Sequence, residues 1–202
     1  MKEIVLVGGG GHCRSCIDLI EQTGEYVIAG IIDLPPKLGK RVLGYPVIGT
    51  DDDIPRLAGE YSAFLVTAGQ IRSPDLRRRL FSLITEAGAG CEAIVSPHAH
   101  VSRHARIGAG SVVLHGAIVN AGAVVGRNTI INSRALVEHD AAIGDHCHVA
   151  TGALINGGVK IGDNTFWGSG SVAREYIRVG EACVIGANIF VRQDVPAKTI
   201  LR

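Results

Sequence analysis

Several features that would mark a particular partner or compartment are scarce in this 202-residue chain. Its 20 basic residues nearly balance its 19 acidic ones, so we expect neither a nucleic acid nor an anionic membrane as a partner. The first apolar run, in MKEIVLVGGGG, is too short for a signal-peptide core or a membrane span. Five cysteines without framework spacing fit free thiols in a reducing compartment. We therefore expect a cytoplasmic protein.

Aromatic residues are also rare, at 4% of the chain, whereas glycine occurs 27 times. This imbalance indicates many tight turns and few bulky core residues. From Ile94 onward the sequence divides into hexapeptides without a gap. The second position of each hexapeptide, from Val95 to Val191, is always apolar, and small residues hold the sixth position from Ala99 to Ala153.

A six-residue repeat fits neither a helix nor an alternating strand, but it is typical of a parallel β-helix. Glycine also recurs in every third hexapeptide, from Gly108 to Gly180, as expected if three flat faces make one coil. We predict that aliphatic side chains fill the prism and that this corner needs the backbone freedom of glycine.

Before residue 92 the pattern changes to strands alternating with helices. Three segments have the pattern of strands: EIVLVGG, YVIAGIID and SAFLVTAG. Two have the pattern of helices, CRSCIDLIEQ and SPDLRRRLFSLITEAG, and the second of these has Ser73 at the N-cap and Pro74 at N1. The predicted architecture is a Rossmann-like α/β half domain at residues 1–92, followed by an all-β domain, the parallel β-helix, at residues 93–202.

The N-terminal half carries a candidate phosphate site. Gly8 to Gly11 follow the first strand and open a helix, although Cys13 replaces the third glycine of a dinucleotide fingerprint. Asp33 ends the second strand, where it can accept hydrogen bonds from a ribose or simply begin a turn. His12 can reach a phosphate or sugar from the loop, or merely cap it, and Gly69 follows the third strand.

The repeat half carries a candidate proton-transfer site in Glu138-His139-Asp140. A carboxylate beside an imidazole fixes its tautomer and raises its basicity, which suits removal of a proton from an amine or hydroxyl. Spacing alone leaves open which acid pairs with His139, and a solvated corner is the alternative. Cys147 lies on the inward phase of the repeat, so we expect packing there and no metal site with the flanking His146 and His148.

Six segments follow one another along the chain in the order GGGGHC, IID, LGYPVIG, VTAGQIR, VEHDAAIGDHCHVATGA and VKIGDNTFWGSGS. In these segments and their order the chain resembles the NeuD/PglD-like family of bacterial sialic acid O-acetyltransferases and UDP-4-amino-sugar N-acetyltransferases. The resemblance covers nearly the whole chain. It implies a left-handed β-helix, a homotrimer, and acetyl-CoA bound between neighbouring subunits.

The resemblance also implies roles for individual residues. His139 is the base, Asp140 the acid that supports it and Glu138 a lesser candidate, while Asn132 lies at the substrate amine. His148 lies beside the thioester. The implied walls of the pantetheine arm are Ser169, Gly186 and Ala187, and the implied nucleotide-sugar pocket contains Gly10, Gly11, His12, Asp33 and Gly69.

The function that follows is transfer of an acetyl group from acetyl-CoA to the 4-amino group of a UDP-linked amino-dideoxy sugar. O-acetylation of sialic acid needs the same base and is the nearest alternative, and a GDP-linked amino sugar is a further variant. A non-catalytic, nucleotide-sugar-binding trimeric scaffold is an alternative of another class.

Overall fold

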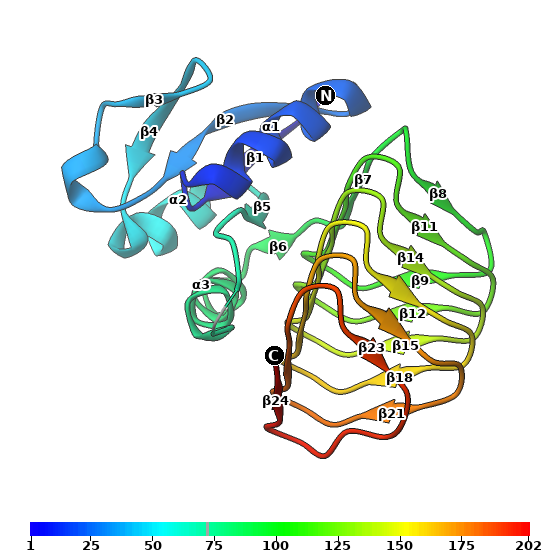
Figure 1. Ribbon diagram of the computed structural model, residues 1–202. Helices are drawn as coiled ribbons and strands as arrows, with labels where there is room; N and C mark the ends of the chain where they lie inside the picture. The colour runs from blue at the N-terminus through cyan, green and yellow to red at the C-terminus, as the bar shows by residue number, and fades with distance from the viewer. Residues whose placement is uncertain (72) are drawn as a thin grey trace.

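The computed structural model describes residues 1–71 and 73–202, so Arg72, the last residue of the VTAGQIR segment, lies outside the described residues. The N-terminal part is a sheet of order β3-β4-β2-β1-β5-β6, in which β3 and β4 pair antiparallel and the other pairs are parallel (Figure 1). Its strands are β1 (Lys2–Val7), β2 (Tyr26–Ile32), β3 (Arg41–Val42), β4 (Tyr45–Gly49), β5 (Ala63–Val66) and β6 (Gly90–Cys91). Its helices are α1 (Gly11–Thr23), α2 (Ile54–Glu60), α3 (Asp75–Glu86) and the 3-10 turns Pro35–Lys37 and Asp51–Asp53.

The three strands and two helices predicted for this part are present as β1, β2, β5, α1 and α3. The start of α3 differs by one residue: Pro74 is the N-cap, and the Ser73 hydroxyl accepts a hydrogen bond from the Asp75 N–H at 3.1 Å. The short elements between residues 41 and 60 were not predicted, because strands of two and five residues and a seven-residue helix are too short to show a clear period.

The remainder is a left-handed β-helix with three flat faces. The first face contains β7 (Ile94–Val95), β10 (Val112–Val113), β13 (Ile130–Ile131), β16 (His148–Val149), β19 (Phe166–Trp167), β22 (Val184–Ile185) and β24 (Ile200–Leu201). The second contains β8 (His100–Val101), β11 (Ile118–Val119), β14 (Leu136–Val137), β17 (Leu154–Ile155), β20 (Val172–Ala173) and β23 (Phe190–Val191). The third contains β9 (Arg106–Ile107), β12 (Val124–Val125), β15 (Ala142–Ile143), β18 (Lys160–Ile161) and β21 (Arg178–Val179).

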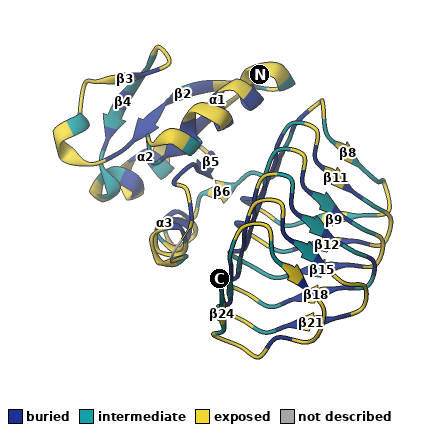
Figure 2. Cartoon of the chain, in the orientation of Figure 1, coloured by how far each residue is buried: buried dark blue, intermediate teal, exposed yellow. Residues whose placement is uncertain are grey.

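Each coil pairs in parallel with the coil that follows it, so that a residue lies beside its equivalent three hexapeptides on, as Val113 does beside Ile131. The predicted interior is confirmed, because the apolar second positions and the small sixth positions form one buried cluster that includes Val137, Cys147 and Trp167. Figure 2 shows this lining as buried and much of the outer turns as exposed.

The glycines that recur once per coil have a different physical reason from the one predicted. They do not take a left-handed backbone angle. Instead, a Cβ atom on Gly162 would lie 2.6 Å from the Glu181 nitrogen and 2.8 Å from the Gly180 carbonyl carbon, both in the next coil. Close stacking of coils therefore requires glycine here. The left-handed angles occur two positions later in the turns, for example at His146 with φ of 56°.

The two parts share a hydrophobic core. Ile17 and Ile20 of α1 pack in one buried cluster with Ile94, Val112 and Ile130, which point outward from the first face of the β-helix. The N-terminal sheet ends at Cys91 and the first strand of the β-helix begins at Ile94. Across the described residues 1–71 and 73–202, no helix has both the length and the apolarity that a membrane crossing demands.

We expect Gly162→Ala to lower the free energy of unfolding by about 1–3 kcal/mol, because backbone atoms of the adjacent coil must shift to admit the methyl group. Gly59→Ala is the matched control. Gly59 lies in α2, and no neighbouring atom lies within 4 Å of its added Cβ. This change should therefore leave the free energy of unfolding unchanged or raise it by a few tenths of a kcal/mol. Thermal unfolding followed by circular dichroism compares the two, and equal melting temperatures would contradict the stacking explanation.

Candidate active site

A pocket of about 260 Å³ lies at the carboxyl ends of β1, β2 and β5. This is where the chain order of the sheet reverses around β1, the usual ligand site of open α/β sheets. We call it the strand-end pocket. It is lined by Gly8, Gly9, Gly10, Ile32, Asp33, Leu34, Lys37, Asp51, Ala68, Gly69, Leu76, Arg79 and Leu80.

The glycine loop at this pocket is shaped by close contacts. Gly8 has φ of 109°, and a Cβ atom there would lie 2.7 Å from the Ala68 nitrogen, so no other residue fits without rearrangement. Helix α1 begins at Gly11 without a side-chain N-cap. Its first-turn N–H groups are therefore unsatisfied by side chains, which favours an anion at this end.

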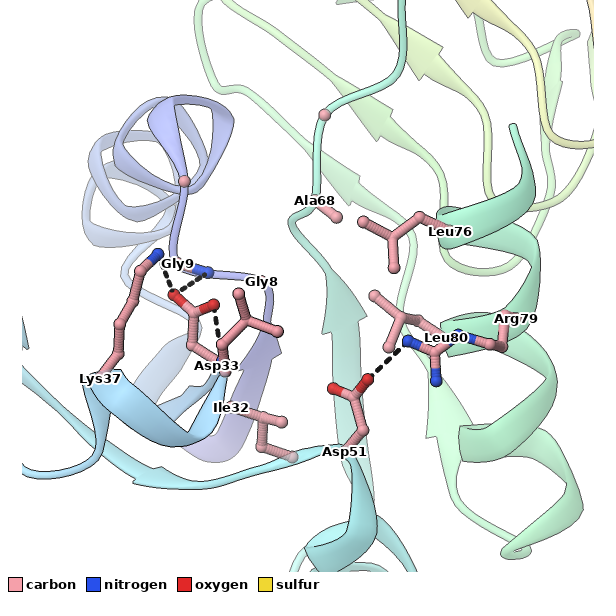
Figure 3. Close-up of a pocket in the computed structure, with 13 residues that line it drawn as sticks. Gly8, Gly9, Ile32, Asp33, Lys37, Asp51, Ala68, Leu76, Arg79 and Leu80 are labelled. Atoms are coloured by element: carbon pink, nitrogen blue, oxygen red, sulfur yellow. Dashed lines mark hydrogen bonds and ion pairs between the residues drawn. The ribbon is translucent and has the colours of Figure 1, made fainter. Parts of the chain in front are cut away.

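Charged side chains flank the strand-end pocket on two walls (Figure 3). The Asp33 carboxylate accepts hydrogen bonds from the Gly9 N–H at 3.2 Å, the Leu34 N–H at 2.8 Å and the Lys37 ammonium at 2.7 Å. On the other wall Arg79 pairs with Asp51 at 2.6 Å. Asp33 is thus held in place by its own chain, and Lys37 adds a cation that the sequence analysis missed although it lies in the turn directly after Asp33.

The predicted pocket residues divide into two groups. Gly10, Asp33 and Gly69 line the strand-end pocket, whereas Gly11 and His12 do not. The His12 ring turns along α1, where its Nε2 lies 3.5 Å from the Cys16 sulfur. Burial, followed by the charge of Arg77, lowers the pKa of His12 to about 3, so this ring is neutral.

The three residues of the EHD segment lie at the turn between β14 and β15, on an edge of the prism. The His139 side chain is 53% exposed, and its Nδ1 lies 2.9 Å from Asp140 Oδ2. Because a carboxylate only accepts, Nδ1 carries the proton and Nε2 keeps a free lone pair. Glu138 instead accepts a hydrogen bond from the His139 backbone N–H at 3.0 Å.

The environment makes His139 a stronger base. The hydrogen bond to Asp140 raises the pKa of the imidazole above its ordinary value, and the charges of Asp140 and Glu138 act in the same direction. The ring also extends over Gly157 of the next coil, where a Cβ atom would lie 2.6 Å from Nε2. Glycine at this place therefore leaves room for the basic nitrogen.

Asn132 and His148 meet at the first face of the β-helix. The Gln70 carbonyl oxygen lies 2.5 Å from His148 Nδ1, so Nδ1 donates there, and His148 Nε2 accepts a hydrogen bond from the Asn132 amide at 3.0 Å. Burial lowers the pKa of His148 to about 4, and the charge of Arg77 acts in the same direction. His148 is therefore a neutral side chain that orients Asn132.

Below His148 the first face carries an uncovered apolar groove. Phe166, Val184 and Ile200 follow His148 on successive strands in register, and they line a cavity of about 630 Å³ with Ile71 and Arg202. A smaller adjoining cavity is lined by Gln70, Ile71, Ser73, Pro74, Asn164, Phe166, Ala182 and Val184. We call the two together the first-face groove. The predicted pantetheine residues Ser169, Gly186 and Ala187 lie in the turns that end β19 and β22, and none of the three is among the residues that line the two cavities.

The predicted residues thus fall on two sides of the chain. The strand-end pocket, His148, Asn132 and the first-face groove lie on the side where the N-terminal part docks. The turn between β14 and β15, with His139, lies at the prism edge opposite the first face and away from the N-terminal part (Figure 1). Within the described part of the chain, no group of three or more His, Cys, Asp or Glu side chains gathers as a possible metal site.

Matches to known families separate the N-terminal part from the repeat region. Residues 3–83 match the PglD N-terminal domain, residues 122–157 the bacterial transferase hexapeptide and residues 158–193 the hexapeptide repeat of succinyl-transferase. Together with the geometry, these matches define a hexapeptide-repeat acyltransferase. A search of curated protein sequences finds no match.

Solved structures match over the whole chain. The acetyltransferase domain of PglB from Neisseria gonorrhoeae is 29% identical with a TM-score of 0.92, covering 99% of this chain and 96% of that one. Perosamine N-acetyltransferase from Caulobacter crescentus, solved as a His-to-Asn variant with CoA and GDP-perosamine, is 31% identical with a TM-score of 0.92, covering 99% and 93%. The chain belongs to the NeuD/PglD-like family of sugar acetyltransferases.

We expect an NMR titration to find the pKa of His139 above that of an unperturbed histidine, and Asp140→Asn to bring it down toward the ordinary value. Glu138→Gln is the matched comparison, and its effect should be smaller because Glu138 does not bond to the ring. A larger shift in Glu138→Gln would identify Glu138 as the partner acid instead.

Proposed function

We propose that this chain transfers the acetyl group of acetyl-CoA to the 4-amino group of a UDP-linked amino-dideoxy sugar, in the biosynthesis of a bacterial surface glycan. The observation that carries the proposal is the His139–Asp140 pair, an exposed imidazole with its basic Nε2 free and its Nδ1 fixed by a carboxylate. Such a pair suits proton removal from an attacking amine.

In the proposed reaction the sugar amine attacks the thioester carbonyl carbon while His139 Nε2 takes a proton from the amine. The tetrahedral intermediate then collapses, the carbon–sulfur bond breaks, and CoA leaves as the thiol once a proton returns to sulfur. No serine or cysteine stands beside His139 in the sequence, so transfer is direct, without an acyl-enzyme. Asp140 stabilises the imidazolium that forms between the two proton transfers.

The strand-end pocket is proposed to hold the nucleoside diphosphate part of the sugar substrate. Three features support this assignment: open glycine backbone at Gly10, the uncapped start of α1, and the Lys37 ammonium at the wall. The perosamine enzyme that resembles this chain was solved with GDP-perosamine, which favours a GDP-linked 4-amino sugar as the second candidate acceptor.

Acetyl-CoA is the proposed occupant of the first-face groove. The PglB acetyltransferase domain, 30% identical over 98% of this chain, was solved with acetyl coenzyme A. The groove is apolar along Phe166, Val184 and Ile200 and leads upward to His148 and Asn132. An arm lying there would place its thioester beside His148, with Asn132 next to it at the substrate amine. Ser169, Gly186 and Ala187 are the proposed walls of its pantetheine part.

A homotrimer is part of the proposal, because His139 and the groove lie on opposite sides of one chain. A site that contains both must take His139 from a neighbouring subunit. Outward-facing apolar side chains support the contact, since Ile118 on the second face and Val124 on the third are exposed in the single chain. Three copies around an axis would cover them and complete three sites.

Release of CoA thiol from acetyl-CoA tests the acceptor. We expect the purified protein to turn over a UDP-linked 4-amino-4,6-dideoxy-hexose, and we would compare the GDP-linked analogue, free sialic acid and CMP-linked sialic acid. Preference for the GDP-linked sugar would select the second candidate. Turnover of sialic acid alone would make the acceptor a hydroxyl, and no turnover with any of them would contradict the proposal.

Mixed assemblies test where the site lies. His139→Ala and Asn132→Ala should each be nearly inactive alone, yet co-expression should restore about a quarter of the wild-type activity, since a quarter of intersubunit sites then receive both intact residues. Co-expression of His139→Ala with the His139→Ala/Asn132→Ala double variant is the control and should stay inactive. No recovery in the first mixture would place the complete site within one chain.

A further inference from the structure

One short segment forms a wall of both cavities. Ala68 and Gly69 line the strand-end pocket, and the next two residues, Gln70 and Ile71, line the first-face groove. The segment follows β5 and leads to α3, so it passes directly from one cavity to the other. A ligand in either cavity therefore contacts this segment.

Gln70 bonds to the β-helix in two ways. Its side-chain amide donates to the His146 carbonyl at 3.0 Å, and its backbone carbonyl accepts the His148 ring proton at 2.5 Å. His148 in turn holds Asn132 at 3.0 Å. Gln70 is 2% exposed, yet its Oε1 has no hydrogen-bond partner within the described chain. A buried acceptor without a partner is costly, so this oxygen is open to a hydrogen bond from a ligand or an ordered water.

Arg77 holds the other end of the segment. This side chain has no exposed surface, and its guanidinium donates to the carbonyls of Val66 at 2.9 Å and Ala68 at 2.6 Å. It also donates to Asn128 Oδ1 of the β-helix at 2.7 Å. Arg77 thus ties the pocket wall to the coil that carries Asn128, one coil before His146.

We propose that Gln70 is a positioning residue that couples the two substrate sites, so that a nucleoside diphosphate in the strand-end pocket changes the affinity of the first-face groove for CoA. The inference rests on the proposed function, since its two ligands are the ones proposed there for the strand-end pocket and the first-face groove. A ligand that orders Ala68 and Gly69 also fixes the Gln70 carbonyl, and through it His148 and Asn132. By thermodynamic linkage, CoA changes nucleotide affinity by the same factor.

Isothermal titration calorimetry measures the coupling directly. CoA is titrated into the whole protein, alone and with saturating UDP or, separately, GDP. We expect a nucleotide to change the CoA dissociation constant by about fivefold or more in the wild type. In Gln70→Ala the side-chain bond to the His146 carbonyl is lost, and with it the contact that holds the Gln70 backbone carbonyl against His148. Both ligands should still bind to this variant, with the ratio of the two CoA constants close to one.

Two further variants complete the design. Arg77→Met should also reduce the ratio, while Arg78→Met is the matched control, because Arg78 is exposed and pairs only loosely with Asp75 at 3.8 Å. If Arg77→Met does not fold, Gln70→Ala still decides the question.

The outcomes separate this inference from the proposed function. A ratio of one in the wild type, or an unchanged ratio in Gln70→Ala, overturns the coupling alone. Failure of CoA to bind under any condition contradicts the proposed function and the coupling with it. Failure of both UDP and GDP to bind removes the ligand of the strand-end pocket and likewise overturns the inference.

Discussion

The register between successive coils is the constraint on which the rest of this structure depends. It stacks each residue on its equivalent one coil later, so that His139 lies over Gly157 and Asn128 over His146. The register is fixed from inside, because a slip of one residue would turn Val and Ile out of the prism and polar side chains into it. The positions of the candidate catalytic groups are therefore consequences of core packing.

Much of the fold could be read from the sequence because its signals are local and periodic. The hexapeptide phase predicted the prism, and the strand and helix patterns predicted β1, α1, β2, β5 and α3. The EHD segment pointed to His139, and the structure pairs its ring with Asp140, a choice that spacing alone left open. The recurring glycines were placed correctly but explained wrongly, since stacking between coils is a contact that one sequence does not display.

What the sequence did not reveal lies at the junction between the two parts. Arg77 stands in a run of three arginines, and its burial depends on α3 docking against a distant coil. A signal did exist: Leu80, Phe81 and Ile84 follow it at helical spacing, which places Arg77 on the apolar face. Likewise His12 was expected at the ligand pocket, but α1 turns its ring toward Cys16.

The register also sets how such a chain can change in length during evolution. A whole coil added after β24 would lengthen the wall of the first-face groove without moving Asn132, His139 or His148. A single hexapeptide inserted between Asn132 and His139 would instead carry the histidine to a different face of the prism. Between these residues, an insertion that lengthens the prism must therefore be a complete coil. A loop added at a turn does not rotate the coils that follow it.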